Sequence, residues 1–201
     1  MLKPIGFIAV TAAFAWLPAT AQARTPADTP APEATEAAPV HPHTAAMAHL
    51  QPLMGDFALS GTQNEADGSV STHMPSMATG APTVGKAGLL LKTHVGVEGG
   101  TAITTHLTLS YDQYRDVYRV AVLDDSSGLL DIYEGTVEDG VLRVDNLRAD
   151  TFYMAGDMKV HFRLVWDMTD TVIDYDVDAS VDGGETWLPF MMMEMVPVKG
   201  Q

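Results

Sequence analysis

The sequence predicts an all-β protein, an antiparallel up-and-down barrel of about eight or nine strands with one short N-terminal helix. The strongest observation is the C-terminal segment: apolar and acidic residues alternate from Ile173 to Asp178, turn residues occupy 180–187, and an apolar run extends from Leu188 to Val198. This pattern is typical of a long β-hairpin. Period-two alternation and clusters of Gly, Asp and Ser recur through the preceding part of the chain. Consecutive hairpins need no crossover and closure removes exposed edges, so a barrel is favoured over a sandwich.

The N-terminal residues have the pattern of an export signal. Lys3 is followed by an apolar stretch from Ile5 to Leu17 and by a small-residue cleavage site, Ala21-Gln22-Ala23. The apolar stretch is shorter than the roughly 20 residues that span a bilayer. We therefore expect a signal peptide over residues 1–23, a periplasmic or secreted mature protein that begins at Arg24, and no membrane insertion after cleavage.

Residues 24–45 are rich in Pro, Ala, Thr and Glu, and their prolines deny them regular hydrogen bonding. This composition predicts a disordered linker, followed by a barrel domain over residues 46–201. Thr44 is predicted to cap a short helix that runs through Met47 and Leu50. Pro52 ends it, because the residue before a proline disfavours the α conformation.

Three segments show the alternation of half-buried strands most clearly. The residues predicted to share the apolar face are Ile103, Thr105, Leu107, Leu109 and Tyr111 in the first segment, Val160, Phe162, Leu164 and Trp166 in the second, and Ile173, Tyr175, Val177 and Ala179 in the third. Shorter strands are predicted over 57–61, 88–94, 118–123, 129–137 and 141–146. Residues 65–86, rich in Gly, Pro, Ser and Met, are interpreted as an irregular insertion, either a mobile loop or a lid over a barrel mouth.

The chain is strongly acidic, with a formal net charge of −15 that is spread along the predicted domain. Such a surface repels phosphate groups, so we expect no nucleic-acid partner. The chain has no cysteine, which excludes disulfides and thiol chemistry. Its stability must therefore come from packing.

Several short motifs follow one another along the predicted barrel. They are Leu53-Met54-Gly55-Asp56-Phe57, Tyr111-Asp112, Tyr118-Arg119-Val120, Asp139-Gly140-Val141-Leu142, and the turn over 180–187 before the last strand. With these motifs the chain resembles a bacterial family of unknown function whose members are small, often exported, and similar in fold to lipocalins and other calycins. The resemblance covers roughly residues 46–198 and implies a calycin-like barrel. One departure is Phe57, which stands where lipocalin-like chains commonly have a tryptophan.

Residues 180–187 also fit the S-x-D-x-G-x-x-W pattern of the Asp-box hairpins that recur in sialidase propellers. A propeller needs several blades and this chain has one copy. The motif is therefore interpreted as a turn device, in which Asp182 binds backbone amides and Trp187 packs beneath the turn.

The same region has the spacing of a calcium loop. The residues at ligand positions are Asp174, Asp176, Asp178, Ser180, Asp182 and Glu185. Ala179 occupies the position at which the sharp turn requires glycine, and the flanking residues alternate like strands. An acidic outer strand face is favoured over a calcium site.

Histidine and methionine residues raise the alternative of a copper or haem protein. The candidates near the start of the domain and in the insertion are His41, His43, Met47, His49, His73, Met74 and Met77. Their spacing matches no compact site, and no axial haem ligand can be chosen among seven histidines. His94 and His106 would face each other only if a three-residue loop joins their strands, and no third zinc ligand is evident.

The chain lacks the local motifs of catalytic nucleophiles, zinc hydrolases and phosphate-binding loops, so no catalytic residue, metal ligand or cofactor is assigned and an enzyme is disfavoured. The primary hypothesis is a binding protein whose barrel interior holds a small apolar or amphipathic ligand. The interior residues expected to contact the ligand are Leu109, Phe162, Trp166, Tyr175 and Met193. The alternatives are a copper, calcium or haem protein, and a barrel that is filled by its own side chains and serves as a scaffold or interaction protein.

Overall fold

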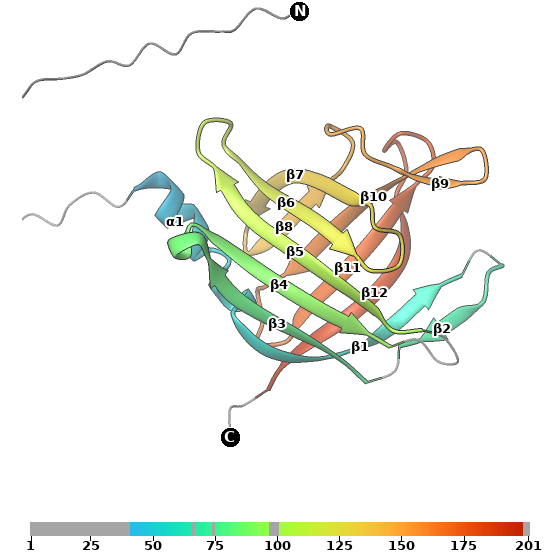
Figure 1. Cartoon of the computed structure of the whole chain (residues 1–201), viewed down its shortest axis with the longest axis horizontal. Coiled ribbons are helices and arrows are strands. Elements are labelled where there is room, and N and C mark those ends of the chain that lie inside the picture. Colours follow the sequence, from blue (N-terminus) through green and yellow to red (C-terminus); the bar gives the residue numbers. More distant parts are fainter. Residues whose placement is uncertain (1–40, 66, 74, 97–100, 199–201) are drawn as a thin grey trace, which may run out of the picture. The chain divides into compact units, whose positions relative to one another are not determined.

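The computed structural model describes residues 41–65, 67–73, 75–96 and 101–198 (Figure 1). The expected signal peptide, and the expected linker up to residue 40, lie outside the described residues. The helical elements are α1 (Pro42–Ala48) and the 3₁₀ helices η1 (Gln51–Leu53) and η2 (Val84–Lys86). The strands are β1 (Gly55–Asn64), β2 (Val70–Thr72), β3 (Ser76–Thr83), β4 (Gly88–Val95), β5 (Ile103–Asp112), β6 (Val117–Asp124), β7 (Leu130–Glu138), β8 (Val141–Asp145), β9 (Tyr153–Ala155), β10 (Met158–Asp167), β11 (Ile173–Ser180) and β12 (Leu188–Pro197). Among the described residues, no helix has the length and apolar character needed to cross a membrane.

Ten of these strands close into an antiparallel barrel. Their order is β11-β12-β1-β3-β4-β5-β6-β7-β8-β10, and pairing between β10 and β11 closes the ring. The two remaining strands extend single barrel strands: β2 pairs with β1, and β9 pairs with β10. The all-β barrel and its one short α-helix are confirmed, but the expected number of eight or nine strands was wrong. The barrel has ten.

The missing barrel strand is β3, which lies inside the segment interpreted as an irregular insertion. That interpretation was wrong because small residues and a proline carry no strand signal by themselves, whereas pairing with β1 and β4 supplies it. Pro82 lies beyond the last residue that pairs with β1, so its missing N–H leaves no gap on that side. Gly80 is required by close approach, since a Cβ there would lie 1.7 Å from the Leu53 carbonyl oxygen.

The predicted strand faces agree with the observed burial. In β5, β10 and β11 the residues of the predicted apolar faces point into the barrel, and a register of Trp166 opposite Tyr175 aligns β10 with β11. The C-terminal hairpin is confirmed as β11 and β12, with one register irregularity between Val177 and Asp178. The acidic residues of β11 therefore lie on the outer face.

One end of the barrel is plugged by the segment that precedes β1. Leu50 and Leu53 are fully buried there, and Met47 joins them on the inner side of α1. The Tyr118 hydroxyl donates a 2.8 Å hydrogen bond to the Ala46 carbonyl oxygen, which ties α1 to β6. The helix begins at Pro42, two residues before the expected cap at Thr44, because His41 adopts the extended N-cap conformation.

The packed core occupies this half of the barrel. Its largest fully buried side chains are Trp166, Leu50, Leu53, Leu91, Leu107, Leu109, Leu142, Ile173, Met193 and Met195. Figure 1 shows α1 at one end of the barrel and the extending strands β2 and β9 toward the other. The two ends therefore differ in structure: one is plugged by a helical segment, and the other carries the extending strands β2 and β9.

Candidate functional site

A cavity of about 530 Å³ occupies the end of the barrel away from α1. Its wall comes from the C-terminal parts of β1, β4, β6 and β11 and the N-terminal parts of β5, β7, β10 and β12, which meet at this end in an antiparallel barrel, together with β9. Most of the lining is apolar or aromatic, with residues that include Val95, Ile103, Val122, Leu129, Tyr133, Tyr153, Val160, Phe162, Tyr175, Val177, Phe190 and Met191. The polar and charged lining residues are Gln63, His73, Thr93, Thr105, Asp124, Ser126, Ser127 and Asp131.

The floor of the cavity is a pair of stacked rings. Trp166 and Tyr175 lie parallel, with 4.8 Å between ring centroids and 7° between ring planes. Tyr175 lines the cavity, whereas Trp166 is completely buried on the side of the packed core. Burial raises the pKa of the Tyr175 phenol, so this ring is neutral at ordinary pH. This pair of neighbouring rings lies where the packed half of the barrel adjoins the cavity.

A second pair of rings forms part of the wall. Phe162 and Phe190 are 5.6 Å apart at a tilt of 54°, and both are only partly buried because they face the cavity. Tyr133 of β7 also lines the cavity and is buried. Its phenol pKa is raised by burial and by the nearby charge of Asp131. Aromatic faces of this kind bind apolar molecules and also attract cations.

Asp131 places a carboxylate in the wall. It is 6% exposed and faces inward from β7 in register with Val122. One oxygen accepts the Ile132 amide at 2.9 Å and the other accepts the Asn146 side-chain amide at 2.9 Å. Asn146, itself fully buried, also accepts the Phe162 amide and so joins β7 to β10 where β8 has ended. No lysine or arginine among the described residues pairs with Asp131.

His73 places an imidazole in the wall just after β2. It is 6% exposed, and neither ring nitrogen makes a hydrogen bond of good geometry within the described part of the chain. Burial lowers its pKa, and this effect outweighs an opposing polar interaction with the Gly96 backbone and the charge of Glu65. The ring is therefore held mainly neutral, with one donor and one acceptor nitrogen.

Asp131 and His73 lie on opposite walls. β7 is five strands from β1 in either direction around the ten-strand ring, and β2, which precedes His73, pairs with β1. Gln63 of β1 also lines the cavity on the His73 side. A molecule in the cavity would thus meet a carboxylate on one side, an imidazole on the other, and aromatic rings between them.

The five residues expected at a ligand site fall into two groups. Phe162 and Tyr175 line the cavity. Leu109, Trp166 and Met193 are buried in the packed half, Leu109 opposite Val120 and Met193 beside Gly61. The period-two pattern finds inward-facing residues, but it does not show how far along the barrel the packing ends.

Sequence reasoning did not single out Asp131, and it named His73 only among the candidate ligands of a copper or haem site. Asp131 belongs to a strand whose other face carries Leu130 and Ile132, so the apolar pattern does not indicate that the carboxylate face is the inward one. His73 belongs to the segment that was interpreted as a loop. A charged residue on the inward register of a predicted strand is the one signal that could have found Asp131.

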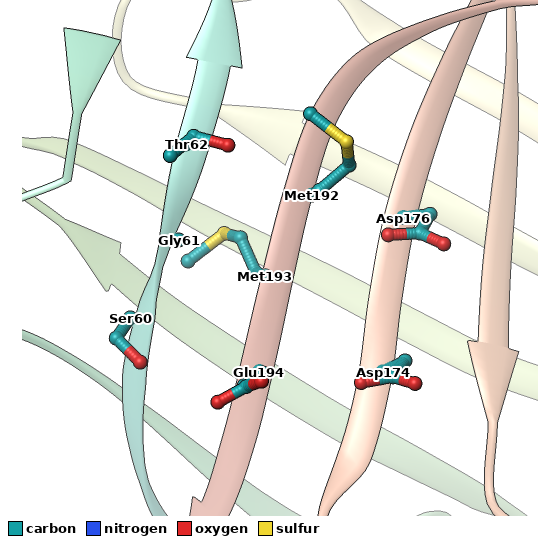
Figure 2. A pocket seen from close by; sticks show the side chains of 8 residues that line it. All are labelled: Ser60, Gly61, Thr62, Asp174, Asp176, Met192, Met193 and Glu194. Carbon is teal, nitrogen blue, oxygen red and sulfur yellow. The ribbon is translucent and has the colours of Figure 1, made fainter.

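A second hollow lies on the outer surface, over β1, β12 and β11 (Figure 2). Ser60, Glu194 and Asp174 form one row across these strands in register. Asp176 lies in the next row, and its pKa is raised by partial burial and then by the charges of neighbouring aspartates. This hollow concentrates negative charge and has no aromatic lining, so it is a weaker candidate for a small-molecule site than the inner cavity.

The residues with calcium-loop spacing do not form such a loop. Asp174, Asp176 and Asp178 lie along β11, and Asp178 forms a 2.7 Å ion pair with Arg163. Asp182 instead builds the hairpin turn: it accepts the Thr186 amide at 3.0 Å and the Ser180 hydroxyl at 2.7 Å. The turn interpretation of residues 180–187 is confirmed, although Trp187 packs on the Arg163 guanidinium at 4.7 Å.

Within the described residues, no three side chains of His, Asp or Glu are placed to hold a metal ion. His43 contacts the Tyr111 carbonyl oxygen at 2.9 Å near α1, far along the chain from His73. His94 lies opposite Thr104, and His106 lies opposite Lys92, so the two histidines do not face each other. Met74 lies outside the described residues.

The closed antiparallel ring, plugged at one end and hollow at the other, defines a calycin-like β-barrel. Neither a protein-family model nor a curated protein matches the sequence. The crystal structure of Rv2717c from M. tuberculosis is similar with a TM-score of 0.55 and 17% identity, over 77% of this chain and 98% of that chain. The structure of EF1p2_mFAP2b bound to DFHBI has a TM-score of 0.41 and 11% identity, over 76% of this chain and 99% of that chain. At 17% identity the first similarity establishes the fold only, and the second is too weak to add to it.

Proposed function

We propose that this protein is an exported calycin-like barrel that binds a small, mainly apolar ligand in the cavity above the Trp166–Tyr175 stack. The single observation that carries the proposal is the cavity itself, about 530 Å³ with a largely apolar and aromatic wall. Pockets for small organic ligands commonly have volumes of about 300–1,000 Å³ and a few polar groups in an apolar lining. The packed half supplies the stability that allows the other half to stay open.

Export is part of the proposal and rests on the N-terminal sequence. Lys3, the apolar stretch over residues 5–17 and the small residues before Arg24 have the order of a cleaved signal. N-terminal sequencing of the protein recovered from the periplasm or medium of its own cells tests this, and the expected first residue is Arg24. An unprocessed N-terminus in that fraction would contradict it.

The binding proposal can be tested by filling the cavity. Ala179 lines the cavity and Ala121 lies on the outward register of β6, so Ala179→Trp and Ala121→Trp add the same bulk inside and outside. The probe is N-phenyl-1-naphthylamine, a neutral apolar dye that fluoresces when it leaves water. We expect the intact chain and A121W to bind it alike, and A179W to lose at least about tenfold in affinity. Equal binding by all three proteins would place the dye outside the cavity and contradict the proposal.

Native mass spectrometry of the protein purified without denaturation addresses the physiological ligand. A co-purifying organic molecule displaced by A179W supports the proposal. A haem protein is the alternative with one observation in its favour, because His73 offers a buried imidazole without a well-formed hydrogen bond at the cavity wall. Soret absorbance that is lost on His73→Gln would support that alternative instead.

A further inference from the structure

The charged groups that line the cavity are of one sign. Asp124 and Asp131 both line it, and none of the described lining residues is a lysine or arginine. The Asp124 carboxylate is engaged at the rim: burial raises its pKa, but hydrogen bonds from Ser126 and Ser127 outweigh this and lower it. Asp131 is deeper, and the charge that it presents to the cavity has no cation beside it.

A buried carboxylate without a cation is costly unless its oxygens are well hydrogen-bonded. Asp131 accepts bonds from the Ile132 amide and from Asn146, the Tyr133 hydroxyl also interacts with its carboxylate, and the carboxylate still has acceptor capacity for a ligand. Asn146 is itself held by its bond to the Phe162 amide, so it fixes the direction of the carboxylate. Asp131 is therefore a negatively charged hydrogen-bond acceptor, held in one orientation in an apolar wall.

The aromatic side chains complement this charge. Tyr133 lies two residues from Asp131 on the same inward face, and Tyr175 and Phe162 line the same cavity. The negative π-face of an aromatic ring attracts a cation when the two are shielded from water. A carboxylate surrounded by such rings favours a protonated amine over a neutral group, and disfavours an anion strongly.

His73 adds a second polar contact on the opposite wall. It is more than nine-tenths buried, lines the cavity, and within the described part of the chain its ring nitrogens make no hydrogen bond of good geometry, apart from a weak polar interaction with the Gly96 backbone. The approach to the cavity is also favourable for cations, because the chain carries a formal net charge of −15. Both observations are independent of Asp131.

We propose that the cavity selects a small amine with an aromatic or apolar body, whose protonated nitrogen binds Asp131 while a second polar group can bond to His73. This inference rests on the proposed function and names the chemical class of its ligand. It predicts an order of affinity among molecules of the same size that differ only in charge.

The probes are 4-phenylbutylamine, 4-phenylbutan-1-ol and 4-phenylbutanoate, which share one apolar body and are cationic, neutral and anionic at pH 7. Binding to the full chain is measured by isothermal titration calorimetry at fixed ionic strength. We expect the amine to bind at least about tenfold more tightly than the alcohol, since a charge-assisted hydrogen bond exceeds a neutral one by about that factor. The carboxylate should bind most weakly.

Asp131→Asn removes the charge and keeps the size of the side chain. It should reduce amine affinity about tenfold and leave alcohol affinity within about twofold, and retained alcohol binding shows that the cavity is intact. The matched control is Asp174→Asn, which makes the same change of net charge on the outer face. It should leave both affinities unchanged.

The outcomes separate the two proposals. If the alcohol or the carboxylate binds the wild-type chain as tightly as the amine, the inference is overturned and the proposed apolar site stands. If D174N weakens the amine as much as D131N does, the preference comes from overall charge and the inference is also overturned. If none of the three binds, both proposals fail. If D131N binds neither the amine nor the alcohol, the ranking measured on the wild-type chain decides alone.

Discussion

Asp182 shows how one side chain holds the turn between the last two strands. Its two oxygens accept bonds from the Thr186 amide, the Thr186 hydroxyl and the Ser180 hydroxyl, while Ser180 also accepts the Gly184 amide. Gly183 and Gly184 both have positive φ, which lets the chain reverse within these bonds. These hydrogen bonds to the charged form lower the pKa of Asp182 to about 2.

The pKa of Asp182 leads to a prediction about acid stability. Because the folded pKa lies below the unfolded value of 3.8, the carboxylate stabilises the fold fully above pH 3.8, and this contribution is lost as pH falls through about 2. Asp182→Ala should therefore lower Tm at pH 5, and the difference from wild type should shrink as pH approaches 2. Differential scanning calorimetry checks this, with the exposed turn variant Asp157→Ala as control. A difference that stays constant with pH would contradict the assignment.

At the scale of the element, the outer face of β11 and β12 is a region of like charge. Asp174 lies directly opposite Glu194 in the antiparallel pair, and it also lies opposite Asp167 of β10. Like charges in directly opposed positions destabilise a sheet. The sequence predicted this acidic face correctly, because period-two alternation assigns residues to faces regardless of what packs inside.

The pKa of Asp176 makes the cost of this face measurable. Partial burial, and then the charges of Asp178, Asp174 and Asp167, raise its pKa above 3.8, so its ionisation destabilises the folded state at neutral pH and costs nothing at a pH below 3.8. Asp176→Asn should raise Tm by about 1 °C at pH 7, a few tenths of a kcal/mol after solvent screening, and the gain should vanish near pH 3.

The matched control for this prediction is Asp157→Asn. Asp157 is an exposed turn residue outside the acidic face, so the same change of charge there should leave Tm almost unchanged. Thermal unfolding followed by circular dichroism at both pH values is sufficient. Stabilisation by D157N equal to that by D176N would show that the destabilisation comes from the net charge of the protein and not from the acidic face.

The strand β3 marks the limit of prediction at this scale. Alternation predicted β5, β10 and β11 and their inward faces, since Leu107, Trp166 and Tyr175 carry the pattern in their own sequence. β3 has mostly small residues, and Gly80 lies there because the Leu53 backbone passes against it. A strand whose side chains must be small, so that a neighbouring segment can pack against it, has no apolar alternation in its sequence. Such a strand can be predicted only when the positions of the neighbouring strands are known.

At the scale of the whole molecule, the barrel has a packed half and a hollow half within one closed sheet. The half near α1 is filled by apolar side chains such as Leu50 and Leu107, and the other half encloses the cavity above the Trp166–Tyr175 stack. The inward faces were predictable from the sequence, but the boundary between filled and hollow was not. The position of this boundary depends on how side chains from different strands pack together at the same height in the barrel. It also depends on single polar residues in the wall, such as Asp131.

This division predicts unequal stability along a single strand. In β5, Leu107 and Leu109 are almost fully buried in the packed half, whereas Ile103 and Thr105 line the cavity. Local opening is easier where few apolar contacts must be broken. The amides near Leu107 should therefore exchange with deuterium more slowly than those near Ile103, by about tenfold or more, although both belong to the same sheet ladder. Hydrogen-exchange NMR of the full chain measures both ends of the strand in one experiment.

Saturating N-phenyl-1-naphthylamine should then slow exchange near Ile103 and leave the packed end unchanged, because only the hollow half gains contacts. Uniform exchange along β5, or protection by the dye at the packed end, would show that the barrel interior is continuous and would contradict the two-half structure.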